Sequence, residues 1–213
     1  MLTSAAIIIL AVLVWGAAHS LLASLAAKAR ARRLFGARAD RLYRLVFNII
    51  SAVTLLPILA LAFLLPDRAI YRIPYPWLLF SLGIQGLAIL TLAAGLLQTG
   101  AMNFLGLEQL FAPPRMAEAR LVTGGLYRWV RHPLYAAGLA LIWLTPVMTV
   151  NILALNIGLT AYILIGIHYE ENKLLKEFGP AYAEYRRHTP ALIPGLKLPG
   201  RTGSRAHPND EMH

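Results

Sequence analysis

The sequence predicts an all-α integral membrane protein with five transmembrane helices, a tight hairpin of the fourth and fifth, and a helical cap after the fifth. Of its 213 residues, 58% are hydrophobic and only 14% are charged, whereas soluble domains carry about 25% charged residues. Five long stretches are uncharged, and the net charge of +10 lies between and after them. The chain has no cysteine, which excludes disulfides and thiolate metal sites.

The first three uncharged stretches, residues 2–27, 45–65 and 77–97, are each long enough to cross a bilayer. The first has no basic residue before its apolar core and is too long for a cleaved signal peptide, so we expect a membrane helix. Pro57 in the second is tolerated in a membrane helix. Tyr75 and Trp77 mark the start of the third, as aromatic residues do at membrane interfaces.

The fourth and fifth stretches, residues 133–150 and 152–168, are separated by too few residues for a loop of any size. They therefore predict a tight helical hairpin. We divide the chain into a three-helix transmembrane part (1–98), a cofactor-binding part with the hairpin and cap (99–199), and a flexible tail (200–213).

The charges separate by side of the membrane. Residues 28–44 carry a net +6, residues 98–132 carry +2 and the tail from 169 carries +1, while residues 66–76 carry only +1. If all five stretches cross, nine of the ten excess charges lie on one side, which the positive-inside rule places in the cytoplasm, with the N-terminus outside. This pattern disfavours a nucleic-acid partner and favours contact with anionic lipid headgroups.

The hairpin brings two charged groups together at this surface, because its two arms rise by nearly equal lengths. The residues before the fourth stretch are Arg128, Arg131 and His132, and those after the fifth are His168, Tyr169, Glu170 and Glu171. One interpretation is an ion-pair cluster that only seats the helix ends. The other is a binding site, into which Tyr135, one turn further on, also points.

The tail continues the fifth helix to Phe178, and Gly179 and Pro180 end it. A short amphipathic helix follows over residues 181–187, with Tyr182 and Tyr185 one turn apart and Arg186 beside them. A helix lying on the membrane surface would explain the aromatic residues equally well.

Three ordered motifs carry a resemblance to a known superfamily. They are Thr123-x-Gly125-x-Tyr127-x-x-Val130-Arg131-His132-Pro133-Leu134-Tyr135-x-x-Gly138, Glu170-Glu171-x-x-Leu174, and Phe178-Gly179-x-x-Tyr182-x-x-Tyr185-Arg186. Together they resemble the integral-membrane methyltransferases, which include isoprenylcysteine carboxyl methyltransferase and the phospholipid methyltransferases. The resemblance implies an S-adenosylmethionine site on the cytoplasmic face of a cell or inner membrane.

The resemblance also implies residue roles. Arg186 is the catalytic candidate, and the cofactor-binding candidates are Gly125, Tyr127, Arg131, His132, Tyr135, Glu170, Glu171 and Leu174. The chemistry agrees, since a carboxylate accepts from ribose hydroxyls or an ammonium group, and His132 or Arg131 can hold a carboxylate.

The first half narrows the resemblance to the NnrU-like and methanethiol S-methyltransferase branch, through Trp15-Gly-Ala-Ala-His19-Ser20 and Arg41-x-Tyr43-Arg44-x-x-Phe47-Asn48. His19 lies inside the membrane, where an ionisable residue is a functional candidate, and we expect it in or near the acceptor pocket. A histidine that only bonds a neighbouring helix is the alternative. Asn48 and Gln85 are expected to link helices.

The predicted function is S-adenosylmethionine-dependent methyl transfer to a lipophilic or small thiol or carboxylate acceptor, without a metal. Two alternatives stay open. One is an NADPH-dependent oxidoreductase similar to sterol reductases, which share an Arg-His-Pro stretch. The other is a non-catalytic NnrU-like membrane protein of nitrogen-oxide metabolism.

Overall fold

The computed structural model describes residues 2–98, 100, 102, 105–107 and 120–196, so the predicted tail 200–213 lies outside the described residues. Within them the protein is mostly α-helical, as the sequence predicts. The elements, in chain order, are α1 (Leu2–Ala23), α2 (Leu25–Phe35), α3 (Ala37–Leu64), β1 (Ala69–Arg72), α4 (Trp77–Gln98), the 3-10 helix η1 (Gly125–Arg128), α7 (Pro133–Trp143), β2 (Val147–Thr149) and α8 (Val150–His188).

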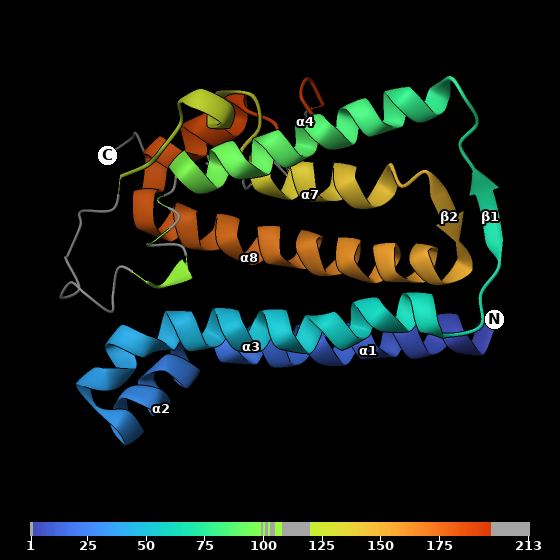
Figure 1. The fold of residues 1–213 in the computed structure, drawn as a ribbon. Coiled ribbons are helices and arrows are strands. Elements are labelled where there is room, and N and C mark those ends of the chain that lie inside the picture. Colours follow the sequence, from blue (N-terminus) through green and yellow to red (C-terminus); the bar gives the residue numbers. More distant parts are fainter. Residues whose placement is uncertain (1, 99, 101, 103–104, 108–119, 197–213) are drawn as a thin grey trace, which may run out of the picture.

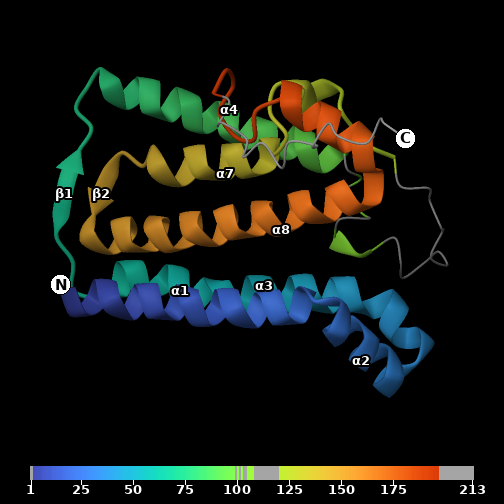
Figure 2. The same cartoon turned by 180° about the vertical axis from the view of Figure 1, so that it is seen from behind.

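The long helices run side by side in one bundle, in which α1, α4 and α8 run in one direction and α3 and α7 in the other (Figures 1 and 2). Helices α1 and α3 pack together, α8 packs against both of them, and α4 packs against α7 on the other side. Side chains of α1, α3 and α8 form the apolar core, at Ile8, Val12, Ile58, Ala62, Ala154 and Leu155. Helix α2 and the end of α8 lie at one end of the bundle, which we call the charged end, and the two strands lie at the other.

Four helices, α1, α3, α4 and α8, are long and apolar enough to cross a membrane, which makes this a multi-pass membrane protein. Helix α8 spans 39 residues but is broken at Gly179. Its continuous part before the break, about 44 Å at 1.5 Å per residue, is longer than the roughly 30 Å of a hydrocarbon core. Its uncharged first half is sufficient to cross. Its second half, from about Tyr169, therefore extends beyond the membrane at the charged end.

The predicted basic segment 28–44 is helical rather than a loop. Ser24 caps α2 by accepting from the Ala27 backbone N–H, and the chain turns at Gly36, whose φ of 59° favours glycine. The basic residues after this turn belong to the first turns of α3, so the second uncharged stretch is the continuation of a longer helix.

The fourth uncharged stretch differs from the expected helix over 133–150. Helix α7 has only 11 residues, or about 16 Å, and the chain then forms β2, which pairs antiparallel with β1. The physical reason lies in Pro146, because a residue before proline disfavours helical geometry. That α7 crosses the membrane as a fifth span therefore stays a prediction. The connection between α7 and α8 contains the strand β2 instead of the expected tight turn.

The backbone carbonyls at the C-terminal end of α7 accept hydrogen bonds from side chains of neighbouring helices. Gln85 of α4 donates to the Leu141 carbonyl at 3.0 Å, and Asn156 of α8 donates to the Ile142 carbonyl at 2.6 Å. The Ser81 hydroxyl donates to the Leu144 carbonyl. Since lipid offers no hydrogen bonds, these contacts allow a short helix to end among apolar segments, and they confirm Gln85 as a residue that links helices.

Close approach of α4 and α7 depends on Gly95. A Cβ atom at this position would lie 2.4 Å from Leu134 Cδ2 and 3.1 Å from its Cγ, whereas a Cβ at Gly86 on the same helix would meet nothing within 4 Å. Gly95→Ala is therefore expected to lower the thermal unfolding temperature in detergent, at a cost of about 1–3 kcal/mol from overpacking.

Gly86→Ala is the matched control and should leave the unfolding temperature unchanged or raise it. In the double variant Gly95→Ala/Leu134→Ala, the smaller side chain at position 134 makes room for the added methyl group. Its unfolding temperature should therefore fall by less than the sum of the decreases in the two single variants. Equal unfolding temperatures for the Gly95 and Gly86 variants would contradict the close-packing account.

Candidate active site

The start of α7 is held by the chain segment that follows α8. The backbone N–H groups of Arg131 and His132 donate to the carbonyls of Pro190 and Ala191, at 2.8 and 3.0 Å. His132 is the residue before α7 and Pro133 is its first helical residue, where the missing N–H costs nothing. This backbone pairing places the side chains of residues 131 and 132 against the extended half of α8.

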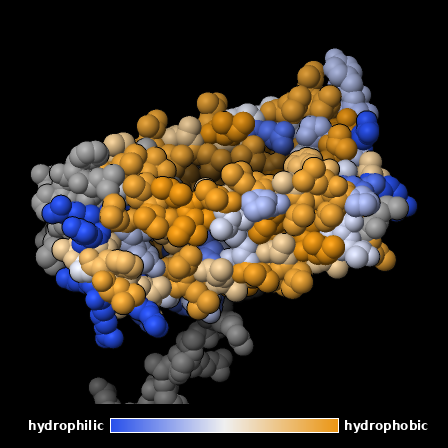
Figure 3. All heavy atoms as spheres, turned by 60° about the horizontal axis from the view of Figure 1, so that its bottom comes forward, coloured by the Kyte–Doolittle hydropathy of each residue, from blue (hydrophilic) through white to orange (hydrophobic). Residues whose placement is uncertain are grey.

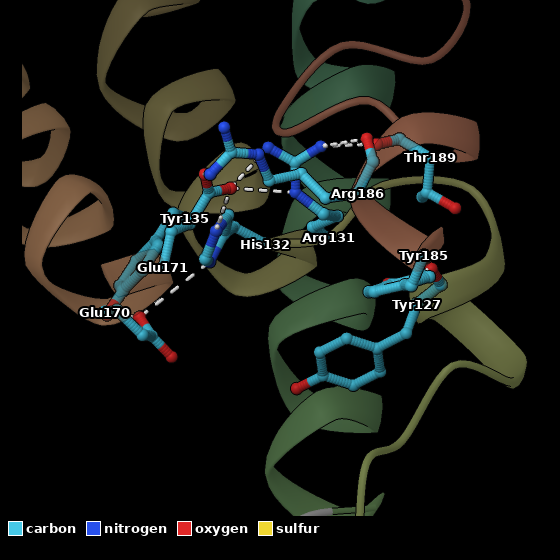
Figure 4. Close-up of polar contacts among 9 residues, drawn as sticks. All are labelled: Tyr127, Arg131, His132, Tyr135, Glu170, Glu171, Tyr185, Arg186 and Thr189. Carbon is cyan, nitrogen blue, oxygen red and sulfur yellow. Dashed lines mark hydrogen bonds and ion pairs between the residues drawn. The ribbon is translucent and has the colours of Figure 1, made fainter. Parts of the chain in front are cut away.

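Arg131 and Glu171 form the central ion pair of the site (Figure 4). Arg131 Nε donates to Glu171 Oε1 at 2.8 Å, and the guanidinium also donates to the backbone carbonyls of Arg186 and Thr189. Only 10% of the Arg131 side chain and 13% of the Glu171 side chain are exposed. The guanidinium therefore ties the start of α7 to both the start and the end of the extended half of α8.

His132 lies between the two glutamates. Its Nε2 atom is 3.3 Å from Glu171 Oε1 and its Nδ1 atom is 3.8 Å from Glu170 Oε2, with 4% of the side chain exposed. The imidazole stacks on Tyr135, with ring centres 5.5 Å apart. His132 is thus oriented by carboxylates on one side and by an aromatic ring on the other.

The neighbouring carboxylates have different surroundings. Glu170 accepts a hydrogen bond from the Tyr135 hydroxyl at 2.9 Å, and 43% of its side chain is exposed. Burial alone would raise the pKa of the Glu171 carboxyl, but hydrogen bonds and positive charge from His132 and Arg131 lower it below its ordinary value. Glu171 is consequently a buried structural anion, whereas Glu170 presents its carboxylate at the rim.

Arg186 approaches the same cluster from the end of α8. Its NH1 atom lies 3.9 Å from Glu171 Oε2, too far for a hydrogen bond, and 39% of its side chain is exposed. Gly179, with φ of 52°, interrupts the helix and starts a new segment after it, as the sequence predicts. This break aims Arg186 back at the glutamates, with its guanidinium accessible to a ligand.

A second arm of the site comes from η1. The Tyr185 hydroxyl donates to the Tyr127 carbonyl at 2.5 Å, and burial together with the Glu170 charge raises the pKa of the Tyr127 phenol. Gly125 adopts φ of 61°, and a Cβ there would lie 3.1 Å from Gln98 Nε2 at the end of α4. Leu174, half-buried, lies one turn beyond the glutamates on α8.

The structure brings together the predicted residues 127, 131, 132, 135, 170, 171 and 186. Gly125 lies at the start of η1 and Leu174 one turn beyond the glutamates, and His19 lies outside this cluster. His19 lies inside the bundle among the rings of Trp15, Phe47 and Tyr162, at centre distances of 5.0, 4.7 and 5.6 Å. Its Nδ1 atom is 2.5 Å from the Tyr162 hydroxyl of α8. Nothing in the sequence pattern singled out Tyr162, because it is one aromatic residue in an apolar helix.

Over the described ranges, no three or more His, Cys, Asp or Glu residues lie close enough together to hold a metal ion. The site is instead a cluster of organic cations, carboxylates and phenols at the charged end of a membrane bundle.

Comparison with known proteins shows what this part of the chain is similar to. Residues 83–181, which include most of α4, all of α7 and most of α8, match the family model described as phospholipid methyltransferase. This match confirms the predicted resemblance to the integral-membrane methyltransferases. No solved structure gives a significant match.

Curated relatives make the resemblance more specific. Methanethiol S-methyltransferase 2 of Bradyrhizobium diazoefficiens is 38% identical over 135 residues, 62% of this chain and 51% of the relative. Methanethiol S-methyltransferase of Mycobacterium tuberculosis is 35% identical, over 55% and 48% respectively, and that of a Pseudomonas species is 34% identical, over 64% and 55%. The chain spans about half the length of these relatives.

The Glu171 ion pair predicts a stability effect. Glu171→Gln leaves Arg131 buried without a counter-charge, and breaking such a pair costs about 3 kcal/mol, so the unfolding temperature in detergent should fall by several degrees. Glu184→Gln is the control, because Glu184 is about half exposed and pairs with Arg187 and His188 at the surface, where a pair contributes roughly 0–1 kcal/mol.

The difference between wild type and the Glu171 variant should depend on pH. Because the pKa of Glu171 is lowered on folding, its contribution is complete above the ordinary glutamate pKa and is lost as pH falls through the lowered value. The two unfolding temperatures should converge at acid pH. A constant difference down to pH 3 would contradict the role of the ionised carboxylate.

Proposed function

We propose that this protein is an S-adenosylmethionine-dependent membrane methyltransferase that acts on a small thiol. The observation that carries the proposal is the rim carboxylate of Glu170 beside His132 and Tyr135, in the stretch that matches a methyltransferase family. The names of the relatives support a thiol acceptor of the size of methanethiol.

The donor set fits the proposed cofactor. Glu170 is half exposed and can accept from ribose hydroxyls or the ammonium group, while Arg186, loosely paired, can hold or steer an anion. Arg131 already donates to Glu171 and to two backbone carbonyls. We therefore propose that Arg131 and Glu171 position His132. The walls of the cofactor site are formed by Gly125, Tyr127, Tyr135 and Leu174.

S-adenosylmethionine, when bound, supplies a methyl group already activated by its sulfonium. The protein then needs to align the acceptor sulfur with that methyl group and exclude water, because displacement depends on proximity and orientation. In this proposal Arg186 steers and stabilises the thiolate. Arg186 is suited to it, because the break at Gly179 aims an exposed guanidinium at the cluster.

His19 belongs to the acceptor side in the proposal. It lines a cavity between α1 and α3, and its bond to Tyr162 links it to α8, the helix that carries Glu170. We further propose that the protein lies in the cell membrane with the charged end in the cytoplasm and the N-terminus outside, since nine of the ten excess charges are expected at that end.

Glu170→Gln tests cofactor binding. Loss of a charge-assisted hydrogen bond should weaken S-adenosylmethionine binding about 10- to 100-fold, measured by calorimetry on protein in detergent. Glu177→Gln, an exposed change on the same helix, should bind as wild type does. Equal affinities of the two variants would remove Glu170 from the site.

Arg186→Ala tests transfer. Turnover of methanethiol to dimethyl sulfide should fall about 100-fold, as when an electrostatic donor is removed, while S-adenosylmethionine affinity stays within about threefold of wild type. Arg187→Ala removes an exposed neighbour that pairs with Glu184 and should keep full turnover. Stabilisation by NADPH instead of S-adenosylmethionine, or binding without transfer to any thiol, would reject the proposed function.

A further inference from the structure

The cavity that the proposed function assigns to the acceptor has a volume of about 530 Å³. Figure 3 looks onto the side of the bundle that α1 and α3 form, where apolar side chains cover most of the surface. Among the described residues that line the cavity, only His19 has a basic side chain. Apolar surroundings favour a neutral thiol over a thiolate, so the thiol has to lose its proton inside the site.

The imidazole of His19 is held by two aromatic rings. The ring centre of Trp15, on the same helix, lies 5.0 Å away, and that of Phe47, on α3, lies 4.7 Å away. The Trp15 indole N–H donates to the Thr54 hydroxyl at 3.1 Å, and Phe47 has no hydrogen-bonding group. These rings fix where the imidazole lies, but they do not decide which of its nitrogens carries the proton.

Tyr162 of α8 makes the hydrogen bond to this imidazole. Its hydroxyl oxygen lies 2.5 Å from His19 Nδ1, and no other described residue hydrogen-bonds to the ring. A neutral imidazole has one donor and one acceptor nitrogen, and the partner of one decides the state of the other. When Nδ1–H donates to the phenol oxygen, Nε2 keeps a free electron pair. The Ser20 side chain approaches the same phenol and can accept a hydrogen bond from its O–H in this arrangement.

The phenol reaches His19 because α1 has a glycine where the Tyr162 ring packs against it. A Cβ atom at Gly16 would lie 2.9 Å from Tyr162 Cδ2 and 3.4 Å from Cε2. Tyr162 is also close enough to Tyr135 for the two phenols to interact electrostatically, and the Tyr135 hydroxyl donates to Glu170. Tyr162 therefore lies between the acceptor cavity and the glutamate cluster, where acceptor and cofactor have to meet.

We propose that Tyr162 is a positioning residue that holds His19 with the proton on Nδ1, so that Nε2 takes the proton of the thiol acceptor. The inference rests on the proposed function. The thiol S–H bond breaks as its proton moves to Nε2, and the sulfur electron pair forms a bond to the methyl carbon. The bond from that carbon to the sulfonium sulfur breaks and leaves its electron pair on the sulfonium sulfur.

The products are a thioether, the neutral demethylated cofactor and an imidazolium, so the positive charge of the sulfonium is replaced by that of His19. Nδ1–H of the imidazolium donates to the Tyr162 oxygen, which stabilises the charged ring. Removal of the proton thus belongs to His19, and steering of the resulting anion stays with Arg186.

Two thiols separate this role from a structural one. Methanethiol is protonated at neutral pH and needs a base, whereas thiophenol is largely ionised and does not. Tyr162→Phe keeps the ring and removes the hydroxyl, so kcat with methanethiol should fall about tenfold and kcat with thiophenol should stay within about threefold of wild type. His19→Ala should show the same selectivity, with a loss of about 100-fold for methanethiol. Tyr71→Phe, an exposed phenol on β1 at the other end of the bundle, is the control and should keep both activities.

Further variants test whether the phenol acts through the imidazole. The double variant His19→Ala/Tyr162→Phe should lose no more than His19→Ala alone. Gly16→Ala displaces the phenol without removing it and should also lower methanethiol turnover selectively, whereas Gly83→Ala, where a Cβ would meet nothing within 4 Å, should not. Unfolding temperatures in detergent identify variants that fail to fold, and the Gly16 and His19 variants retain the test if Tyr162→Phe does.

Nitrogen NMR of the protein without cofactor tests the hydrogen bond itself. With isotope-labelled histidine, the His19 signals are those that are missing from His19→Ala. They should show the proton on Nδ1 in the wild type and on Nε2 in Tyr162→Phe.

Equal losses with the two thiols in Tyr162→Phe, a further loss in the double variant, or a wild-type proton on Nε2 would overturn the assignment while the proposed function stands. A wild-type protein that methylates neither thiol would reject the proposed function, and the assignment with it. Selective loss with methanethiol together with a change of tautomer in Tyr162→Phe is the supporting result.

Discussion

The ion pair of Arg131 with Glu171 is the interaction on which the site depends. It joins the start of α7 to two parts of α8 about 40 and 55 residues further along the chain: the start of its extended part and its last turn before Thr189. Both charges are largely buried, so each requires the other. With them in place, His132 is oriented between two carboxylates and Glu170 is left at the rim.

Helix lengths place this cluster at the membrane surface. Helix α8 before its break at Gly179 is longer than the hydrocarbon core is thick, so we expect its charged half to stand outside the membrane, at the same end of the bundle as α2. Helix α7 is short, and its last carbonyls are satisfied by Gln85 and Asn156 of its neighbours. The bundle thus holds the start of α7 against the extended half of α8, although α7 is much shorter than α8.

Much of this arrangement could be predicted. The uncharged stretches identify the long helices, Gly179 marks the break in α8, and the return of the chain after the fourth stretch brings Arg131 and His132 to the glutamates, although α7 is much shorter than the expected arm. The end of α7 at Trp143 could not be predicted from hydrophobicity, because residues 144–149 are apolar in either a helix or a strand. Their pairing with β1 depends on residues about 80 positions earlier in the chain.

The sequence by itself determined the membrane class, the charged end and the meeting of Arg131 and His132 with the two glutamates, because apolar runs, charge distribution and helix rise are local properties. The other site residues were implied by the resemblance to a known superfamily. Only the tertiary structure decided which of these residues is buried as a structural group and which is exposed to a ligand. Glu170 and Glu171 are chemically identical neighbours, but successive side chains on a helix point about 100° apart, so one is buried against Arg131 and the other is exposed. In the same way, packing against Tyr162 places His19 in an aromatic cluster apart from the glutamates.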